Sequence, residues 1–230
     1  GRMTEITATC EPMTPTSGNG QGNPADTPSP RVMRLGDLLG EWEADATAAH
    51  DALVNQTARG PVTGFPVLDR ELGGALSPGL HILHGQPGAG KTAFALQVAA
   101  QCGVPCLFIS CEMSPLELLR RITARVTSTF LVRFKTGEMA PADSLAKARQ
   151  AVMTVPHLAI ADLTQAFAMP SWLAQQAINC KGDGRHVLVI VDSLHSWAQA
   201  APGNLVEYEA LNAAIQSIRK LAAVIDCPVL

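Results

Sequence analysis

The sequence predicts an α/β protein with a mainly parallel sheet that is covered by helices on both faces. From about residue 79 onward, short apolar runs of strand length alternate with longer segments whose apolar residues recur at helical spacing. Parallel strands need crossover connections of helix length, and these longer segments supply them. With 230 residues, of which 47% are hydrophobic, the chain can bury the core that such a sheet requires.

The region before the sheet divides into a tail and a helix. Residues 1–33 are rich in Thr, Pro, Gly, Asn and Ser, and we expect a disordered N-terminal tail because so few large apolar side chains cannot offset the entropy of ordering. Apolar residues at helical spacing predict an amphipathic helix over about 35–56, within a linker of residues 34–59. Its apolar stripe packs either on the protein's own core or on a neighbouring subunit. The segment TARGPVTG, with two glycines and a proline, separates this helix from a domain at 60–230.

A phosphate-binding loop is predicted at residues 85–92, between a strand at 80–83 and a helix. Its sequence, GQPGAGKT, fits the pattern GxxxxGK[ST] without a mismatch. Glycines let several backbone N–H groups turn toward one anion, and the following helix points the positive end of its dipole at the same place. Lys91 is expected to reach the β- and γ-phosphates, and the Thr92 hydroxyl to hold Mg²⁺. The predicted nucleotide-binding residues are Gly85, Gln86, Pro87, Gly88, Ala89, Gly90, Lys91 and Thr92.

The rest of the domain is predicted as alternating strands and helices. The clearest helix start is at Ser114, which is a suitable N-cap, with Pro115 at the first helical position and Glu117 three residues after the cap. The expected strands are 106–110, 158–161, 187–191 and one that begins at 229, and the expected helices are 114–128, 142–154, 171–180 and 205–225.

Two acidic residues follow predicted strands and are therefore expected at one edge of the sheet. Asp192 ends the strand 187–191, where an acid can hold Mg²⁺ through its water shell. Glu112 follows the strand 106–110, and a carboxylate there that is not committed to a metal suits the activation of water for phosphoanhydride hydrolysis. Simpler interpretations are a polar residue that closes a strand for Asp192 and an acid favoured by a helix dipole for Glu112.

Composition limits the class of partner. A net charge of −3 and a pI near 6.1 exclude a surface that is basic all over, so contact with nucleic acid needs local Arg/Lys clusters or several assembled copies. Six cysteines without a CxxC pair indicate buried, reduced thiols. Because no apolar run approaches the roughly 20 residues of a membrane span, we expect a cytoplasmic protein without a membrane partner.

Six blocks of the sequence, in this order and spacing, resemble the RecA-like ATPase domain of the replicative DNA helicases of the DnaB family. They are TGFPVLDRELGGALSPG, GQPGAGKTAFALQVA, ISCEMSPLELLRRITAR, KTGEMAPADSLAKA, VLVIVDSL and YEALNAAIQSIRKLAAVIDCPVL. The resemblance covers about residues 35–230 and implies a RecA-like P-loop NTPase core behind a linker helix that docks on the adjacent subunit of a hexameric ring. It also implies ATP and Mg²⁺ as cofactors, and single-stranded DNA and other replication proteins as partners.

Residue by residue, the resemblance implies that Lys91 binds phosphate, that Thr92 and Asp192 position Mg²⁺, and that Glu112 is the catalytic glutamate. The implied function is that of an ATP-binding and ATP-hydrolysing helicase domain coupled to DNA translocation. Two alternatives stay open. One is a RecA-like or RadA-like ATPase of recombination or repair, which GQPGAGKT and DSL favour. The other is a nucleotide-dependent regulatory or loading module with little turnover.

The sequence departs from the family pattern in several places. DSLH follows the strand 187–191 where the family usually carries an aromatic residue, and a polar tail precedes the linker helix. We expect the domain to be C-terminally incomplete at Leu230, before the family's phosphate sensor and arginine finger.

Signals for DNA contact are weak. A DNA-facing loop is expected at 197–205 but contains no Lys or Arg. The main basic cluster, which a solvated helix face or a subunit interface explains equally well, is Arg120, Arg121, Arg125, Arg133 and Lys135.

Overall fold

The structure is a computed structural model that describes residues 32–203 and 205–230. The predicted tail at 1–33 lies outside the described residues except for its last two positions. Contacts divide the chain into two units, Gly1–Ala46 and Thr47–Leu230. Loop 85–92 and both predicted acids belong to the second unit, so the candidate site can be described within that unit alone.

The helix expected at 35–56 is present. It begins with a 3-10 turn, η2 (Leu35–Leu38), and continues as α1 (Leu39–Val54). At its start the Asp37 carboxylate accepts a hydrogen bond of 3.1 Å from the backbone N–H of Arg34. The helix ends slightly earlier than predicted because Gln56 adopts a φ of 52°, a left-handed conformation that cannot continue an α-helix.

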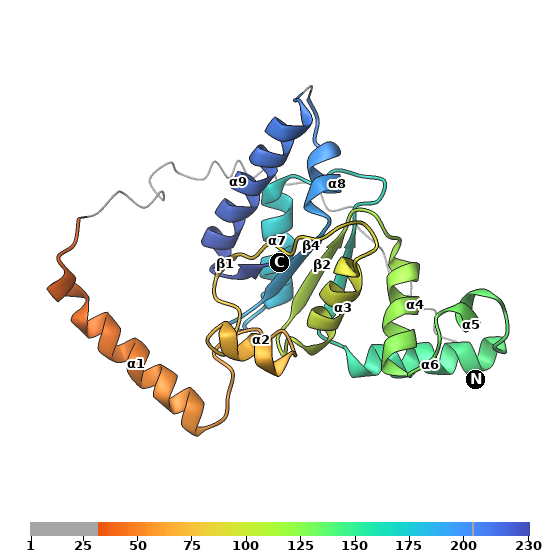
Figure 1. The fold of residues 1–230 in the computed structure, drawn as a ribbon, viewed down its shortest axis with the longest axis horizontal. Helices are drawn as coiled ribbons and strands as arrows, with labels where there is room; N and C mark the ends of the chain where they lie inside the picture. Colours follow the sequence, from red (N-terminus) through yellow and green to blue (C-terminus); the bar gives the residue numbers. More distant parts are fainter. Residues whose placement is uncertain (1–31, 204) are drawn as a thin grey trace, which may run out of the picture. The chain divides into compact units, whose positions relative to one another are not determined.

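Five strands form one sheet in the described part of the second unit, in the order β1-β5-β4-β2-β3 (Figure 1). Every pair is parallel, so the predicted fold class is confirmed. The strands are β1 (Gly79–Leu80), β2 (Cys106–Ser110), β3 (Leu158–Asp162), β4 (Leu188–Asp192) and β5 (Pro228–Val229).

Helices cover both faces of this sheet. One core lies under α3 (Lys91–Gln101), α4 (Pro115–Val126) and α6 (Pro141–Thr154), and the other lies under α7 (Pro170–Lys181), α8 (Leu194–Gln199) and α9 (Glu207–Ile225). Figure 1 shows α3 and α4 on one side of the sheet and α7 and α9 on the other. Two short helices, α2 (Pro66–Glu71) and α5 (Val132–Lys135), lie in connections.

The central strands are apolar on both faces because both faces are covered. In β2, Leu107 and Ile109 belong to the core under α7, α8 and α9, whereas Phe108 belongs to the core under α3, α4 and α6. In β4, Val189 and Ile190 divide between the two cores in the same way. Alternate side chains of a strand point to opposite faces, so a strand buried on both sides appears in sequence as an unbroken apolar run.

Strand β1 is shorter than the predicted strand 80–83. Only Gly79 and Leu80 pair with β5, and the backbone N–H of His81 adds one further hydrogen bond of 2.8 Å to Val229. Beyond this point Ile82 is 63% exposed. A strand extends only as far as its partner, and β5 offers two paired residues, so apolar character alone overestimated the length of β1.

The segment 197–205, expected as a DNA-facing loop, is not a loop throughout. Its first residues belong to α8, which Ser193 caps by accepting a hydrogen bond from the backbone N–H of Ser196. No helix among the described residues is both long and apolar enough to cross a membrane. The five cysteines in the described residues are free thiols; Cys102, Cys106 and Cys227 are buried, as predicted, whereas Cys111 and Cys180 are only partly buried.

Candidate functional site

The residues predicted to act in the site follow strands that end at one rim of the sheet. Ser110, the last residue of β2, lies opposite Asp192, the last residue of β4, in the parallel ladder. The backbone N–H of Cys111 donates a hydrogen bond of 2.8 Å to the carbonyl of Asp192, which ties the turn carrying Glu112 to the end of β4. Because β1 runs parallel to its neighbour, loop 85–92 follows it at the same rim. The structure therefore brings the loop and both acids together.

Loop 85–92 folds around the ammonium group of its lysine. The Lys91 Nζ atom donates hydrogen bonds of 2.8 Å to the carbonyl of Gly85 and 3.1 Å to the carbonyl of Gln86. Gly88 and Gly90 have φ angles of 80° and 92°, in the left-handed region that favours glycine. No side chain caps the start of α3 in the described chain, so the N–H groups of its first turn are left for an anion such as phosphate.

Asp192 is a buried carboxylate beside this loop. It is 8% exposed, and burial raises its pKa, as does the negative charge of Glu112. A hydrogen bond from the Thr92 hydroxyl and the positive charge of Lys91 act in the opposite direction on the pKa of Asp192. A carboxylate held in this way gains from any cation placed next to it.

Glu112 lies in the turn between β2 and α4, and hydrogen bonds of Ser110 and Ser114 hold this turn in place. The buried Ser110 hydroxyl donates a hydrogen bond of 2.6 Å to the carbonyl of Met113, and Ser114 caps α4 by accepting from the backbone N–H of Glu117, as predicted. The pKa of Glu112 is lowered, chiefly by hydrogen bonds from Ser193 and Ser196 and also by the charge of Lys91. Glu112 is therefore ionised at neutral pH, as a group that accepts a proton must be.

The chemistry of the nearby donors fits Mg²⁺. Thr92 and Asp192 offer a hydroxyl and a carboxylate oxygen, which are ligand types that Mg²⁺ prefers. No group of three or more His, Cys, Asp or Glu side chains that could hold a metal occurs in residues 32–203 and 205–230. A cation at this site would therefore need further oxygen ligands, and the phosphates of a nucleotide provide them.

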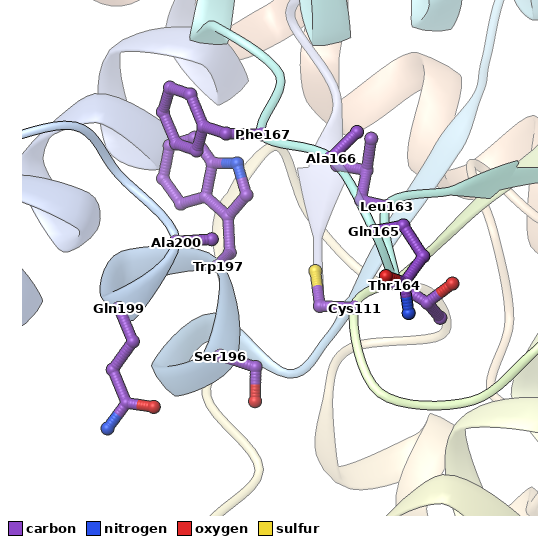
Figure 2. A pocket seen from close by; sticks show the side chains of 10 residues that line it. All are labelled: Cys111, Leu163, Thr164, Gln165, Ala166, Phe167, Ser196, Trp197, Gln199 and Ala200. Carbon is purple, nitrogen blue, oxygen red and sulfur yellow. The ribbon is translucent and has the colours of Figure 1, made fainter.

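A cavity of about 410 Å³ lies next to the acids, between the loop that follows β3 and helix α8. Figure 2 shows the stacked rings of Phe167 and Trp197 with Cys111 and Ser196 below them; the ring centroids are 5.7 Å apart. Burial, together with the charges of Asp192 and Glu112, raises the pKa of Cys111 to about 12. Cys111 is therefore a neutral thiol in the lining of this cavity and not a nucleophile.

The predicted basic cluster is largely engaged with acids. Glu117 lies at its centre, with Lys135 Nζ at 2.7 Å and Arg121 Nε at 3.2 Å from its carboxylate. The contacts of the five basic residues are Arg120–Glu117, Arg121–Glu117, Lys135–Glu117, Arg133–Glu138 and a hydrogen bond from Arg125 to Gln97. These contacts favour a solvated, ion-paired helix face over a free basic surface.

Sequence reasoning missed the partners of Glu112. Ser193 and Ser196 lie at the start of α8 and donate to the carboxylate of Glu112. The available signal was the serine pair at spacing i, i+3 directly after a strand that ends at the active rim. His195 lies between them in sequence, and its Nε2 atom is 3.2 Å from the Glu207 carboxylate.

Comparisons with known proteins identify a family for this chain. The sequence profile described as the DnaB-like helicase C terminal domain matches residues 60–230. A relative, the replicative DNA helicase DnaB of Synechocystis sp., is 27% identical over 209 residues, which cover 88% of this chain and 23% of that protein.

Two solved structures share the fold. The ATPase domain of G40P has a TM-score of 0.68 and 22% identity, with 81% of this chain and 68% of that chain covered. A DnaB-like replicative helicase, described with its interactions with primase, has a TM-score of 0.65 and 21% identity, with 81% and 47% covered. At these identities the two structures support the fold alone. The chain thus spans less than a quarter of its sequence relative and about half of the second structure.

Proposed function

The chain belongs to the DnaB-like helicase C-terminal domain family, and from that premise we propose that it is an ATP-hydrolysing motor domain of a replicative DNA helicase. The observation that supports this most directly is the meeting of loop 85–92, Asp192 and Glu112 at one rim of a parallel sheet. Domains of this type place ligands at the carboxyl ends of their strands. Within the chain we assign residues 60–230 to the ATPase domain and residues 34–59 to a linker.

In the proposed reaction, loop 85–92 binds the triphosphate of ATP through its N–H groups and Lys91. Mg²⁺, when held by Thr92 and Asp192, neutralises charge on the phosphate oxygens. The oxygen of a water molecule forms a bond to the γ-phosphorus, and the bond from that phosphorus to the β–γ bridging oxygen breaks. The electron pair of the broken bond goes to ADP, and the proton of the water goes to Glu112.

The partners of the domain are part of the same proposal. Its substrate polymer is single-stranded DNA, and several copies form a hexameric ring in which the linker helix of one copy docks on the next. The exposed apolar residues of α1, which include Leu39 and Trp42, are compatible with docking on a second copy. Other replication proteins are the remaining proposed partners.

The proposal is tested by ATP turnover with and without single-stranded DNA. We expect Glu112→Gln to retain nucleotide binding and to lose turnover by roughly 100-fold or more, because the group that accepts the proton is gone. The exposed glutamate Glu209 on α9 provides a matched control, and Glu209→Gln should behave as wild type. Normal turnover in Glu112→Gln would remove Glu112 from this role.

The two alternative functions are separated by further readouts. Turnover stimulated by single-stranded DNA argues against a regulatory module, which would hydrolyse little ATP. Directional strand displacement by the assembled protein separates a helicase from a recombination ATPase. Turnover that DNA does not stimulate would contradict the motor assignment.

A further inference from the structure

Two serine hydroxyls converge on a single oxygen of Glu112. Ser193 Oγ lies 2.5 Å and Ser196 Oγ lies 2.6 Å from Glu112 Oε1, and both donate to it. The two hydroxyl oxygens are 3.1 Å apart. Since each hydroxyl has one proton, both protons are used on Glu112 and neither is left for the other serine.

The second carboxylate oxygen is in a different situation. Among the described residues, no hydrogen bond to Glu112 Oε2 accompanies the two that reach Oε1. A carboxylate that is anchored through one oxygen has a fixed orientation and keeps its other oxygen for a ligand. This is the arrangement that a proton acceptor needs, because catalysis depends on holding the reacting group in place.

We propose that Ser193 and Ser196 are positioning residues, which fix Glu112 through Oε1 and leave Oε2 to accept the proton of the attacking water. The inference rests on the proposed function and adds two residues to it. Neither serine touches the reacting atoms, and both act through Glu112.

Charged groups on three neighbouring elements interact with Glu112. Lys91 at the start of α3 and His195 on α8 favour the ionised carboxylate, whereas Asp192 on β4 is a second acid beside it. The serine hydroxyls are nevertheless the largest influence that lowers the pKa of Glu112. Removal of one hydroxyl therefore raises that pKa even though the surrounding charges stay in place.

The two serines differ in their value as test sites. Ser193 is also the N-cap of α8, so Ser193→Ala would weaken the helix and Glu112 anchoring together. Ser196 caps nothing, and its side chain lines the cavity of about 410 Å³. That space can take the extra methyl group of a threonine, which makes Ser196→Thr a variant that keeps the hydroxyl.

The test is steady-state ATP turnover of the full chain as a function of pH. We expect Ser196→Ala to lower kcat by roughly tenfold, with KM for ATP within about twofold of wild type. The acid limb of kcat should move to higher pH, because Glu112 must be ionised to act and its pKa has risen. Ser196→Thr should restore both values, and Ser171→Ala, at an exposed serine of α7, should match wild type.

The failures of the two proposals can be told apart. If Ser196→Ala leaves kcat and the acid limb unchanged, the positioning role is overturned. The function proposal is then still intact, because it is tested separately by the turnover of Glu112→Gln and by stimulation with single-stranded DNA. Turnover that single-stranded DNA does not stimulate overturns the function proposal. An NMR titration of the Glu112 carboxyl needs no turnover: a pKa raised by Ser196→Ala and restored by Ser196→Thr supports the anchoring, and an unchanged pKa overturns it.

Discussion

The backbone N–H of Cys111 donates to the carbonyl oxygen of Asp192, so the turn that carries Glu112 cannot move away from β4 without breaking this hydrogen bond. The bond holds Glu112 and Asp192 at one rim of the sheet, next to Lys91. The result is an electrostatic conflict, since burial and the charge of Glu112 both raise the pKa of Asp192. A cation bound next to Asp192 would reduce this repulsion. Without such a cation, the ionised Asp192 carboxylate lowers the stability of the folded protein at neutral pH.

We predict that Asp192→Asn stabilises the nucleotide-free chain and abolishes Mg²⁺-dependent turnover. A carboxyl pKa that is raised by folding means that the folded state holds the proton more tightly, so stability falls as pH rises through the unfolded and then the folded pKa. The asparagine side chain is a neutral amide that does not ionise, so the variant avoids this loss of stability. Calorimetry at pH 7 should show a higher Tm, by roughly 2–4 °C for each kcal/mol recovered.

The difference in Tm between Asp192→Asn and wild type should shrink below pH 3, and Asp183→Asn, at an exposed position, should leave Tm unchanged. An equal or lower Tm for Asp192→Asn at pH 7 would contradict the conflict between the acids.

Lys91→Ala should weaken nucleotide binding. Its ammonium group is already held by the carbonyls of Gly85 and Gln86 at the mouth of the loop, where it can exchange these partners for phosphate oxygens. Loss of hydrogen bonds from a charged donor should reduce affinity by about 10- to 100-fold, measured by titration with a fluorescent ATP analogue. The exposed Lys220 on α9 provides the control, and Lys220→Ala should bind normally. Equal affinities for the two variants would exclude Lys91 from phosphate binding.

A matched pair of glycines separates backbone strain from function. Gly88 and Gly137 have φ angles of 80° and 77°, and a Cβ at either position would meet no atom within 4 Å. Alanine should therefore cost each about 1–2 kcal/mol of stability through the backbone angle alone, measured by urea unfolding. Only Gly88→Ala should also weaken nucleotide binding, because the N–H of Gly88 belongs to the loop that we propose to bind phosphate. Similar affinity in both variants would argue against the loop assignment.

Ser110→Ala should loosen the turn that presents Glu112. The Ser110 hydroxyl is fully buried and donates to the carbonyl of Met113, which would lose this partner at a cost of about 1–3 kcal/mol. We expect a lower urea midpoint and a fall in kcat that exceeds any change in KM. Thr164→Ala, which removes a hydroxyl bonded to Asp162 at an exposed turn, controls for the loss of a local hydrogen bond. Destabilisation with unchanged kcat would show that Glu112 does not depend on this turn.

The parts of the fold with local signals could be predicted from sequence. Strand β2 occupies residues 106–110 as predicted, because Gly103 and Pro105 end the preceding helix and the strand is apolar on both faces. Helix α4 begins at Pro115 because Ser114 caps it. The rim that unites Glu112 and Asp192 was also predictable, since parallel strands end at a common edge.

Contacts between distant segments could not be predicted in this way. The bonds from Ser193 and Ser196 to Glu112 join residues 81 and 84 positions apart in the sequence, and no local pattern encodes such a distance. The length of β1 depended on a partner strand far along the chain. The start of α8 at residue 194 was missed because the serine that caps it was interpreted as part of a family pattern, as a departure from one family and a sign of another, and not as a helix cap.

The order of the strands has a consequence for how the protein is made. In the part of the chain that the structure describes, β5 is the sole sheet neighbour of β1, and β5 follows every other strand in sequence. Pairings between segments far apart in the chain form slowly, because a long loop must close first. During synthesis on the ribosome, β2, β3 and β4 can therefore assemble first, and we expect β1, which leads into loop 85–92, to join the sheet only when residues 228 and 229 have emerged.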